Sequence, residues 1–220
     1  MKKIEIKEFG GPEVLEIKNV DIGKPGQNEV LVKNSSIGIN YIDTYHRSGL
    51  YPIPLPSGIG LEACSIIEEV GSEVKLFKVG DRVTRASMPI GTYSEKQIIP
   101  EDKLVKVPDN ISDEVASCIT LKGITAEYLL HRTYQVKKGD KILYHAAAGA
   151  LGQIFCLWAN ALGAEIIGTV GSDEKIEIAK KNGCHHVINY NEKNFVEEVE
   201  KIIGKNGLDV VYDGVGAKTF

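Results

Sequence analysis

The residues with the clearest chemical meaning are small ones that follow an apolar run in the middle of the chain. Ala147, Gly149 and Gly152 form the pattern A-x-G-x-x-G. Such a loop lets the turn after a buried strand close tightly, and it brings backbone N–H groups against a pyrophosphate at the start of a helix. The pattern predicts a dinucleotide-binding loop, in which the residues next to the pyrophosphate are Gly149, Ala150, Leu151 and Gly152.

The flanking sequence supports this interpretation. Residues 141–146 have the composition of a buried strand, apolar residues recur at helical spacing over 151–162, and a second apolar run covers 166–170. Strand, helix and strand is the order in which a dinucleotide-binding crossover begins.

Residues 142–164 carry no formal charge, so a transmembrane helix is the alternative for this stretch. Glycines, Gln153 and Asn160 interrupt it, and residues 1–9 contain no apolar core of signal-peptide length. The cysteines are scattered without a C-x-x-C pair, as is typical of reduced thiols. The net charge of −4 disfavours nucleic acid or an anionic membrane as the main partner. We therefore expect a soluble, cytoplasmic protein.

The pattern of apolar residues, Gly and Pro changes near residue 120. Before it, short alternating runs punctuated by Gly and Pro predict a compact β-rich domain, with strands at 3–7, 14–20, 29–37, 64–70, 82–85 and 92–99. Helical patterns follow at 113–118 and 123–134. Beyond them, strands at 141–146, 165–170, 186–189 and 208–212 alternate with helices at 151–162, 173–181 and 194–203. The sequence predicts an α/β fold with a β-rich domain at 1–120 and a parallel-sheet nucleotide-binding domain at 121–220.

A doubly wound dinucleotide domain has about six strands, and only four are predicted here. We therefore expect either a fragment or a naturally shortened protein. The strand at 208–212 would then be an exposed sheet edge, which promotes aggregation, and one half of the dinucleotide-binding cleft would lose a wall. The expectation for the chain alone is aggregation and little or no activity.

Several runs together resemble one protein family along the whole chain. They are IGINYIDTYHRSGLYPIPLPSGIGLEA (37–63), VGDRV (79–83), LKGITAEYLL (121–130), GDKILYHAAAGALG (139–152), ALGAEIIGTVGSDEK (161–175) and VINY (187–190). This sequence resembles the NADPH-dependent quinone oxidoreductases of the zeta-crystallin type, in the medium-chain dehydrogenase/reductase superfamily. The resemblance implies a GroES-like catalytic domain, a Rossmann domain, NADPH as cofactor, a quinone as substrate, and a homodimer for the full-length protein.

The end of the second strand of the crossover bears on the choice of cofactor. NAD-specific domains usually place Asp or Glu there to hold the ribose 2′-hydroxyl, but this chain continues with Gly171 and Ser172. By resemblance, Gly171, Ser172 and Lys175 form a site for the 2′-phosphate of NADPH, and Tyr190 closes over the adenosine end. The alternative is an ordinary solvated helix start capped by Ser172.

One position departs from the family pattern. Where the family usually has Gly-Gly, this chain has Gly149-Ala150. If Ala150 is the first residue of the helix, the added methyl group costs little. If it must adopt a left-handed conformation, cofactor binding suffers.

The resemblance also assigns the catalytic end. It implies that Asn40, Asp43, Tyr45 and Tyr51 are catalytic, with Asn40, Tyr41 and Asp43 near the nicotinamide, Tyr45 and Tyr51 lining the quinone pocket, and Tyr128 contacting the cofactor. Each Tyr could instead be a packing residue. The N-x-x-D spacing of Asn40 and Asp43 could instead simply cap a helix.

Three functions are therefore compared. The first is zinc-independent reduction of quinones by hydride or electron transfer from NADPH. The second is an enoyl or alkenal reductase of the same superfamily, and the third is a truncated, non-catalytic remnant. The NYIDTYHRSGLY motif favours the first.

The sequence further predicts a metal-free protein. Where related alcohol dehydrogenases carry zinc ligands, this chain has GINY at 38–41 and GLE at 60–62, with neither Cys nor His. His46 and Glu62 alone do not make a zinc site. Elemental analysis of the purified protein should find no stoichiometric zinc. One zinc per chain that survives dialysis against a chelator would contradict this prediction.

Overall fold

The computed structural model describes residues 1–217 and 219. The chain divides into two compact units, Met1–Leu121 and Lys122–Phe220, and each is described by itself. Among the described residues, no helix is both long enough and apolar enough to cross a bilayer.

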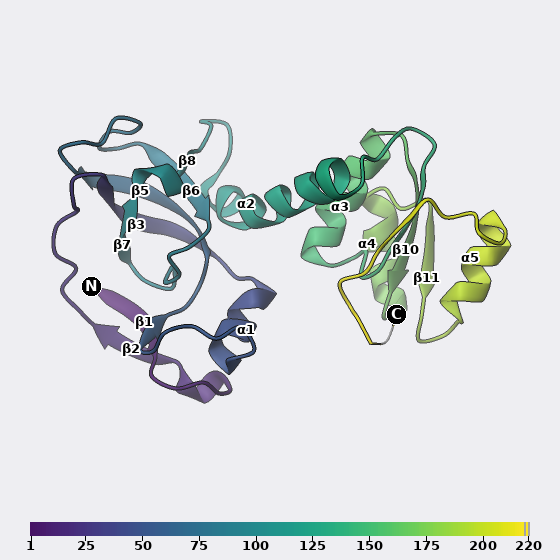
Figure 1. Ribbon diagram of the computed structural model, residues 1–220, viewed down its shortest axis with the longest axis horizontal. Helices are drawn as coiled ribbons and strands as arrows, with labels where there is room; N and C mark the ends of the chain where they lie inside the picture. The colour runs from purple at the N-terminus through teal and green to yellow at the C-terminus, as the bar shows by residue number, and fades with distance from the viewer. Residues whose placement is uncertain (218, 220) are drawn as a thin grey trace. The chain divides into compact units, whose positions relative to one another are not determined.

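The first unit is built from two antiparallel sheets (Figure 1). The larger sheet has the order β7 (Lys96–Pro100), β3 (Glu29–Gly38), β5 (Glu62–Val70), β6 (Arg82–Ala86) and β8 (Val105–Lys106). The smaller has the order β2 (Glu16–Asn19), β1 (Lys2–Ile6) and β4 (Ser57–Gly58). The core of the larger sheet consists of Val30, Val32, Ile67, Val83, Ile99 and Leu104.

A short helix, α1 (Tyr41–Ser48), follows β3 directly. It begins after Asn40, whose backbone is extended, and it ends at Gly49, whose φ of 80° is left-handed. Glycine is favoured at such a helix end because it has no Cβ to clash in that conformation. The turn from β3 into α1 therefore has fixed limits, and α1 carries two of the predicted catalytic residues, Asp43 and Tyr45.

The second unit contains a four-stranded parallel sheet. Its order is β11 (His186–Asn189), β10 (Glu165–Val170), β9 (Lys141–Tyr144) and β12 (Val210–Tyr212). Figure 1 shows α3 (Ala150–Ala161) and α4 (Ile176–Lys181) on one side of this sheet and α5 (Phe195–Ile203) on the other. Because helices cover both faces, the strands need nearly continuous apolar runs, as the sequence has.

Alternate residues of the central strands divide between two cores. Ile142 and Ile166 pack with Phe155 of α3. The next residues along the strands, Leu143 and Ile167, pack with Val199 of α5 and other residues on that face. The predicted fold class, an α/β chain with a β-rich part and a parallel sheet, is confirmed.

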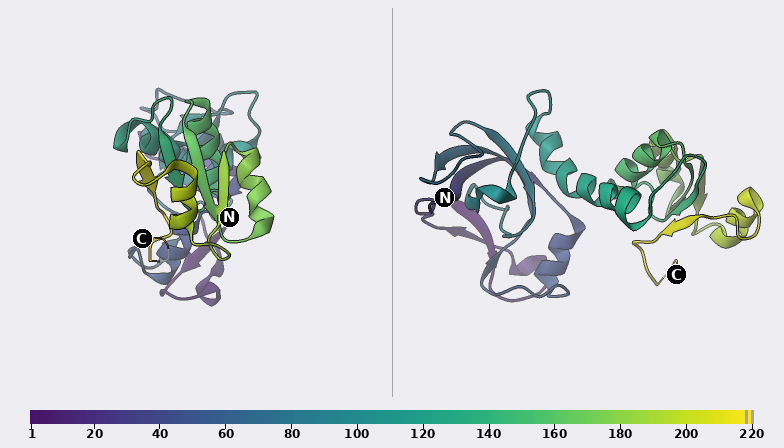
Figure 2. Two further views of the ribbon diagram at one scale, coloured as in Figure 1. Left: turned by 90° about the vertical axis from the view of Figure 1, so that its right-hand side faces the viewer. Right: turned by 45° about the horizontal axis from the view of Figure 1, so that its top comes forward.

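The structure differs from the predicted elements in one main place. Helices were predicted at 113–118 and 123–134, but α2 (Asp113–Tyr128) is a single helix, which the right-hand view of Figure 2 shows, followed by a π-helical turn (Leu129–Thr133). Gly123 inside a helix costs about 1 kcal/mol relative to Ala. Nucleating a second helix costs more than continuing the first, so the helix runs through.

Smaller differences lie at element ends. The predicted strand at 92–99 begins only at Lys96, because the backbone N–H groups of Thr92 and Tyr93 donate to carbonyls of Gly60 and Ile59 instead. The strand predicted at 14–20 is shortened to Glu16–Asn19 by a 3-10 turn at Pro12–Val14. The helix predicted at 173–181 begins with a 3-10 turn, Asp173–Lys175.

Gly152 should tolerate no side chain without a loss of stability. A Cβ on Gly152 would lie 2.6 Å from the carbonyl oxygens of both Ala146 and Ala147, and both are backbone atoms that cannot swing aside. We expect Gly152→Ala to lower the free energy of unfolding by about 1–3 kcal/mol, measured by urea denaturation. Gly214→Ala is the control, because a Cβ there meets no atom within 4 Å. Equal losses in the two variants would contradict the packing argument.

Candidate functional site

The glycine-containing loop of the second unit connects β9 to α3. Ala147 donates its N–H to the carbonyl of Thr169 at 3.0 Å, which ties the loop to β10. The strained residue is Ala146, with φ of 60°, and Ala150 is the first residue of α3. The first N–H groups of a helix have no partner within the helix, so this end can bind an anion. Because Ala150 is the first residue of the helix and is not left-handed, its methyl group should cost cofactor binding little.

The end of β10 brings two predicted adenosine-side residues together. A Cβ on Gly171 would lie 2.8 Å from the hydroxyl of Tyr190, so the tyrosine side chain lies directly over this glycine. The backbone N–H of Tyr190 donates to Val170 at 3.1 Å, and the amide of Asn191 donates to the carbonyl of Gly171 at 2.7 Å. These bonds hold the start of the segment after β11 beside the end of β10.

Ser172 and Lys175 follow at the same strand end. The N–H of Lys175 donates to the carbonyl of Ser172 at 3.1 Å, but the Ser172 side chain makes no capping hydrogen bond. The backbone carbonyl of Ser172 therefore caps this helix start, and its side chain does not. The Ser172 hydroxyl is not committed to the helix.

The carboxylate of Asp173, which is close to Lys175 in the sequence, is hydrogen-bonded to another strand. The amide of Asn189 donates to Asp173 Oδ1 at 2.8 Å, which anchors this carboxylate to β11. Lys175 is exposed, and within residues 1–217 and 219 it forms no ion pair. Its ammonium group is therefore able to meet an anion from solvent.

The parallel sheet also has a switch point that the sequence did not reveal. The order β11, β10, β9, β12 reverses direction between β9 and β12, and ligands of open α/β sheets bind at the carboxyl ends of strands at such a point. His145 follows β9 and Asp213 follows β12. Neither was predicted as a site residue, and the only local signal was a His after an apolar strand.

His145 is a buried polar residue, with 2% of its surface exposed. Its Nδ1 lies 2.8 Å from the Thr169 hydroxyl, and its ring packs edge-on against Phe195 at a centroid distance of 5.0 Å. Burial lowers the pKa of His145, although Asp213 opposes this shift. The imidazole is therefore neutral at pH 7, since an ordinary His already titrates near pH 6.5.

In the first unit, Asp43 organises the start of α1. Its Oδ2 accepts the backbone N–H of Asn40 at 2.9 Å and the phenol O–H of Tyr93 at 2.9 Å. Asp43 is buried, and burial together with the Asp43 bond raises the pKa of Tyr93. The capping alternative for N-x-x-D is confirmed for Asp43, and Tyr93 is a partner that the sequence did not indicate.

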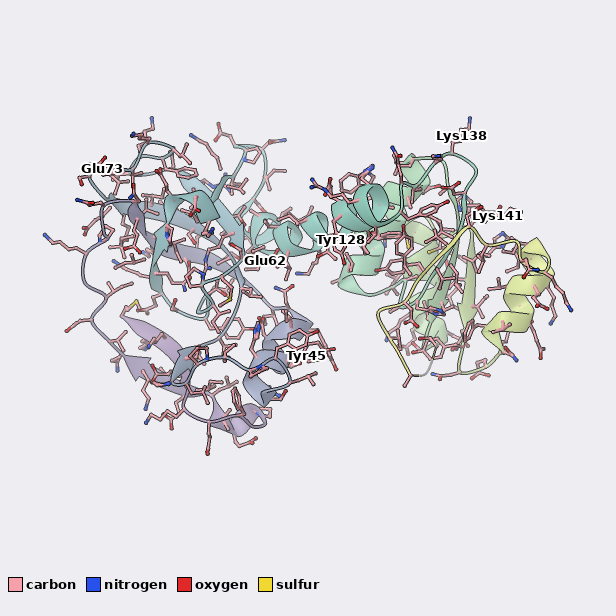
Figure 3. All side chains as sticks on the ribbon, viewed as in Figure 1. Tyr45, Glu62, Glu73, Tyr128, Lys138 and Lys141 are labelled. Atoms are coloured by element: carbon pink, nitrogen blue, oxygen red, sulfur yellow. The ribbon has the colours of Figure 1, made fainter. Side chains whose placement is uncertain are left out.

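The side chain of Asn40 points to a second buried carboxylate. Its amide donates to Glu62 Oε2 at 2.9 Å, and the backbone N–H of Leu121 donates to Glu62 Oε1 at 2.7 Å. Glu62 is labelled in Figure 3 and is 0% exposed.

The aromatic residues of α1 and the loop after it gather on one surface. The Tyr41 and Tyr45 rings lie 5.3 Å apart, and the Tyr45 and Tyr51 rings lie 5.2 Å apart. Tyr41 is 76% and Tyr51 is 50% exposed, so core packing does not describe these two residues. Figure 3 labels Tyr45 on α1. An exposed group of aromatic rings suits a flat, partly apolar ligand.

Tyr128, predicted to contact the cofactor, belongs to the second unit. It is the last residue of α2, with 43% of its surface exposed. Within the described part of the chain, its side chain makes no hydrogen bond to the loop after β9. Its contact with a cofactor stays a prediction.

The acidic and metal-ligating side chains do not converge. Within residues 1–217 and 219, no group of three His, Cys, Asp or Glu side chains could hold a metal ion. The zinc prediction is left to elemental analysis.

Burial of His145 predicts how stability depends on pH. Because the pKa of His145 is lower in the folded chain, the unfolded chain takes up the proton first as the pH falls. This contribution to stability is therefore full above about pH 6.5 and is lost below it. We expect the free energy of unfolding to fall less steeply between about pH 7 and about pH 5 in His145→Gln than in the unaltered chain. The exposed His131→Gln is the control, and equal slopes in all three proteins would contradict the assignment.

Two family models match the chain. The first, described as the alcohol dehydrogenase GroES-like domain, covers residues 26–109. The second, described as zinc-binding dehydrogenase, covers residues 150–220. They fall on the β-rich unit and on the parallel-sheet unit, respectively.

Individual relatives are similar along the whole chain. The quinone oxidoreductase of Pseudomonas aeruginosa is 49% identical over 220 residues, which are 100% of this chain and 68% of the relative. A 2-haloacrylate reductase of a Burkholderia species is 47% identical over 221 residues, covering 97% of this chain and 66% of that protein. The crystal structure of Escherichia coli quinone oxidoreductase complexed with NADPH has a TM-score of 0.96 and 49% identity, covering 98% of this chain and 67% of that one.

This chain thus spans about two thirds of the length of these relatives. Identity of this extent, over two domains in the same order, establishes common descent and a common fold. The chain belongs to the quinone oxidoreductase family of the medium-chain dehydrogenase/reductase superfamily.

Proposed function

We propose that this chain carries the catalytic and cofactor-binding groups of an NADPH:quinone oxidoreductase. In this proposal residues 1–120 are the GroES-like catalytic domain and residues 121–220 are the NADPH-binding domain. The observation that carries it is the end of β10, where Tyr190 lies over Gly171, Asp173 is held by Asn189, and Lys175 is exposed.

This arrangement supports NADPH over NADH. No carboxylate follows β10 directly, so the usual partner of a ribose 2′-hydroxyl is missing there. Lys175 brings a positive charge to a helix start, where a cation is disfavoured by about 0.3–1 kcal/mol in the absence of an anion. A 2′-phosphate would reverse that penalty, with the uncommitted Ser172 hydroxyl as a second partner. The pyrophosphate would lie at the N-terminus of α3, against Gly149, Ala150, Leu151 and Gly152.

NADPH supplies the hydride, and the chain must hold the acceptor and exclude water from it. We assign Asn40, Tyr41 and Asp43 to the nicotinamide end and the Tyr45–Tyr51 pair to the quinone. Tyr128 is assigned to the cofactor. A quinone needs little activation because its reduced form is aromatic, so the proposed reaction requires no zinc.

Two further assignments follow from the same proposal. All four cysteines are free thiols, and Cys64, Cys156 and Cys184 are buried, which supports a reducing compartment and hence the cytoplasm. A homodimer is proposed for the complete protein, with a small electrophile rather than nucleic acid or membrane as the ligand.

Reduction of an activated alkene is the second candidate, because one relative at 47% identity is a 2-haloacrylate reductase. Oxidation of NADPH at 340 nm, followed in parallel with 1,4-benzoquinone, a 2-alkenal and 2-chloroacrylate, separates the two. We expect the highest kcat/KM with benzoquinone. Preference for an alkene would replace the first proposal by the second, and oxidation with none of them would favour a non-catalytic chain.

Lys175→Ala tests the cofactor assignment. Loss of a charge-assisted contact to the 2′-phosphate should cost roughly 1.5–3 kcal/mol of NADPH binding and almost nothing of NADH binding. Isothermal titration calorimetry with both nucleotides measures this. Lys181→Ala, an exposed lysine on α4, is the matched control and should leave both affinities unchanged. Equal losses of NADPH and NADH binding in Lys175→Ala would exclude Lys175 as the phosphate partner.

A further inference from the structure

Glu62 is a carboxylate with no solvent contact. It is 0% exposed, and its two oxygens accept hydrogen bonds from two segments that are distant in the sequence. One donor is the side-chain amide of Asn40, 22 positions away, and the other is the backbone N–H of Leu121, 59 positions away. A buried carboxylate needs donors that compensate for its lost hydration, and these two bonds contribute to that compensation.

The backbone around Glu62 leaves this carboxylate little room to move. A Cβ on Gly38 would lie 2.9 Å from Glu62 Oε2, and it would collide with the carbonyl oxygen of Ser117 in α2. The Ser36 and Ser117 hydroxyl oxygens lie 2.8 Å apart and hold the same end of β3 against α2. No side chain fits at Gly38, because β3 and α2 meet at this point and Glu62 lies beside them.

These contacts fix the Asn40 amide in one orientation. If the amide turned over, its carbonyl oxygen would face the Glu62 carboxylate, and two acceptors would oppose each other in a buried site. The Asn40 backbone is fixed independently by the bond from its N–H to Asp43. Main chain and side chain of Asn40 are thus each held by a different buried carboxylate.

We propose that Glu62 is a positioning residue for the reaction, which acts through the orientation of the Asn40 amide. The proposal rests on the proposed function, in which Asn40 contacts the nicotinamide. A misplacement of about 1 Å in such a contact can cost on the order of 100-fold in rate, so a fixed amide has a direct kinetic value. Binding of NADPH depends mainly on the phosphate-binding residues of the second unit and should depend less on Glu62.

The first test needs no turnover. In the unaltered chain, side-chain amide protons of Asn40, assigned by their loss in Asn40→Ala, should exchange with water at least 10-fold more slowly than those of exposed Asn28. Glu62→Gln should shift the Asn40 amide signal, because one of the two oxygens that accept these bonds becomes an NH2 group, which only donates. Glu69→Gln, an exposed position on the same strand, should leave it in place. Rapid exchange in the unaltered chain would overturn the proposal even if Glu62→Gln failed to fold.

The second test uses NADPH oxidation with 1,4-benzoquinone. Glu62→Gln should lower kcat about 10- to 100-fold while KM for NADPH changes less than about threefold, and Glu69→Gln should match the unaltered chain. In an Asn40→Ala background, Glu62→Gln should have no further effect on kcat, because the amide through which Glu62 acts is absent. An unchanged kcat in Glu62→Gln, or effects that multiply in the double variant, would overturn the positioning role. Absence of turnover in the unaltered chain would instead favour the non-catalytic alternative, and the exchange measurement would still decide whether Glu62 holds the amide.

Discussion

The packing of α3 against the loop after β9 is the constraint on which the nucleotide-binding unit depends. Gly152 lies so close to the carbonyl oxygens of Ala146 and Ala147 that no side chain fits between them. The helix can therefore begin at Ala150, after the short loop 145–149, and its first N–H groups lie at the carboxyl edge of the sheet. Ala146 adopts a left-handed conformation to make this turn, at a cost of about 1–2 kcal/mol. Packing of the buried Phe155 and Cys156 on the same helix offsets that cost.

The two-sided sheet follows from the same geometry. Once α3 covers one face, the strand residues that point the other way need a second cover, which α5 provides through Val199 and its neighbours. The loops at the carboxyl ends of the strands are then the part of the sheet where polar groups can gather. His145 directly follows β9, and Lys175 lies in the 3-10 turn after β10. The positions of these groups are thus a consequence of the packing beneath them.

The first unit differs from the second in that it buries acidic side chains next to the predicted catalytic residues. Asp43 and Glu62 are both buried carboxylates, and each accepts hydrogen bonds from Asn40 and from one further donor. In each pair the second donor comes from another element: Tyr93 for Asp43 and Leu121 for Glu62. Removing one partner from such a group leaves a buried charge without compensation, which is costly. This polar network ties the start of α1 to other segments of its unit.

The sequence by itself determined the elements with strong local periodicity. The strands at 165–170 and 186–189 have the predicted limits, and Gly149 and Gly152 lie at the start of a helix that follows a strand, as their pattern required. Alternation of apolar residues and the absence of a Cβ act over a few neighbouring positions, so they can be detected in the sequence alone. The resemblance to a family supplied the assignment of Asn40 and the tyrosines, which no local pattern contained.

Only the tertiary structure decided which polar atoms meet. The sequence excluded Glu62 as part of a zinc site but assigned it no partner, and it gave no sign that Tyr93 binds Asp43 across 50 positions. It also divided α2 into two helices, because a single glycine weakens the local helical pattern more than it weakens a helix already formed. Bonds between distant side chains depend on the register of one element against another. That register is set by the packing of whole surfaces, which no short stretch of sequence encodes.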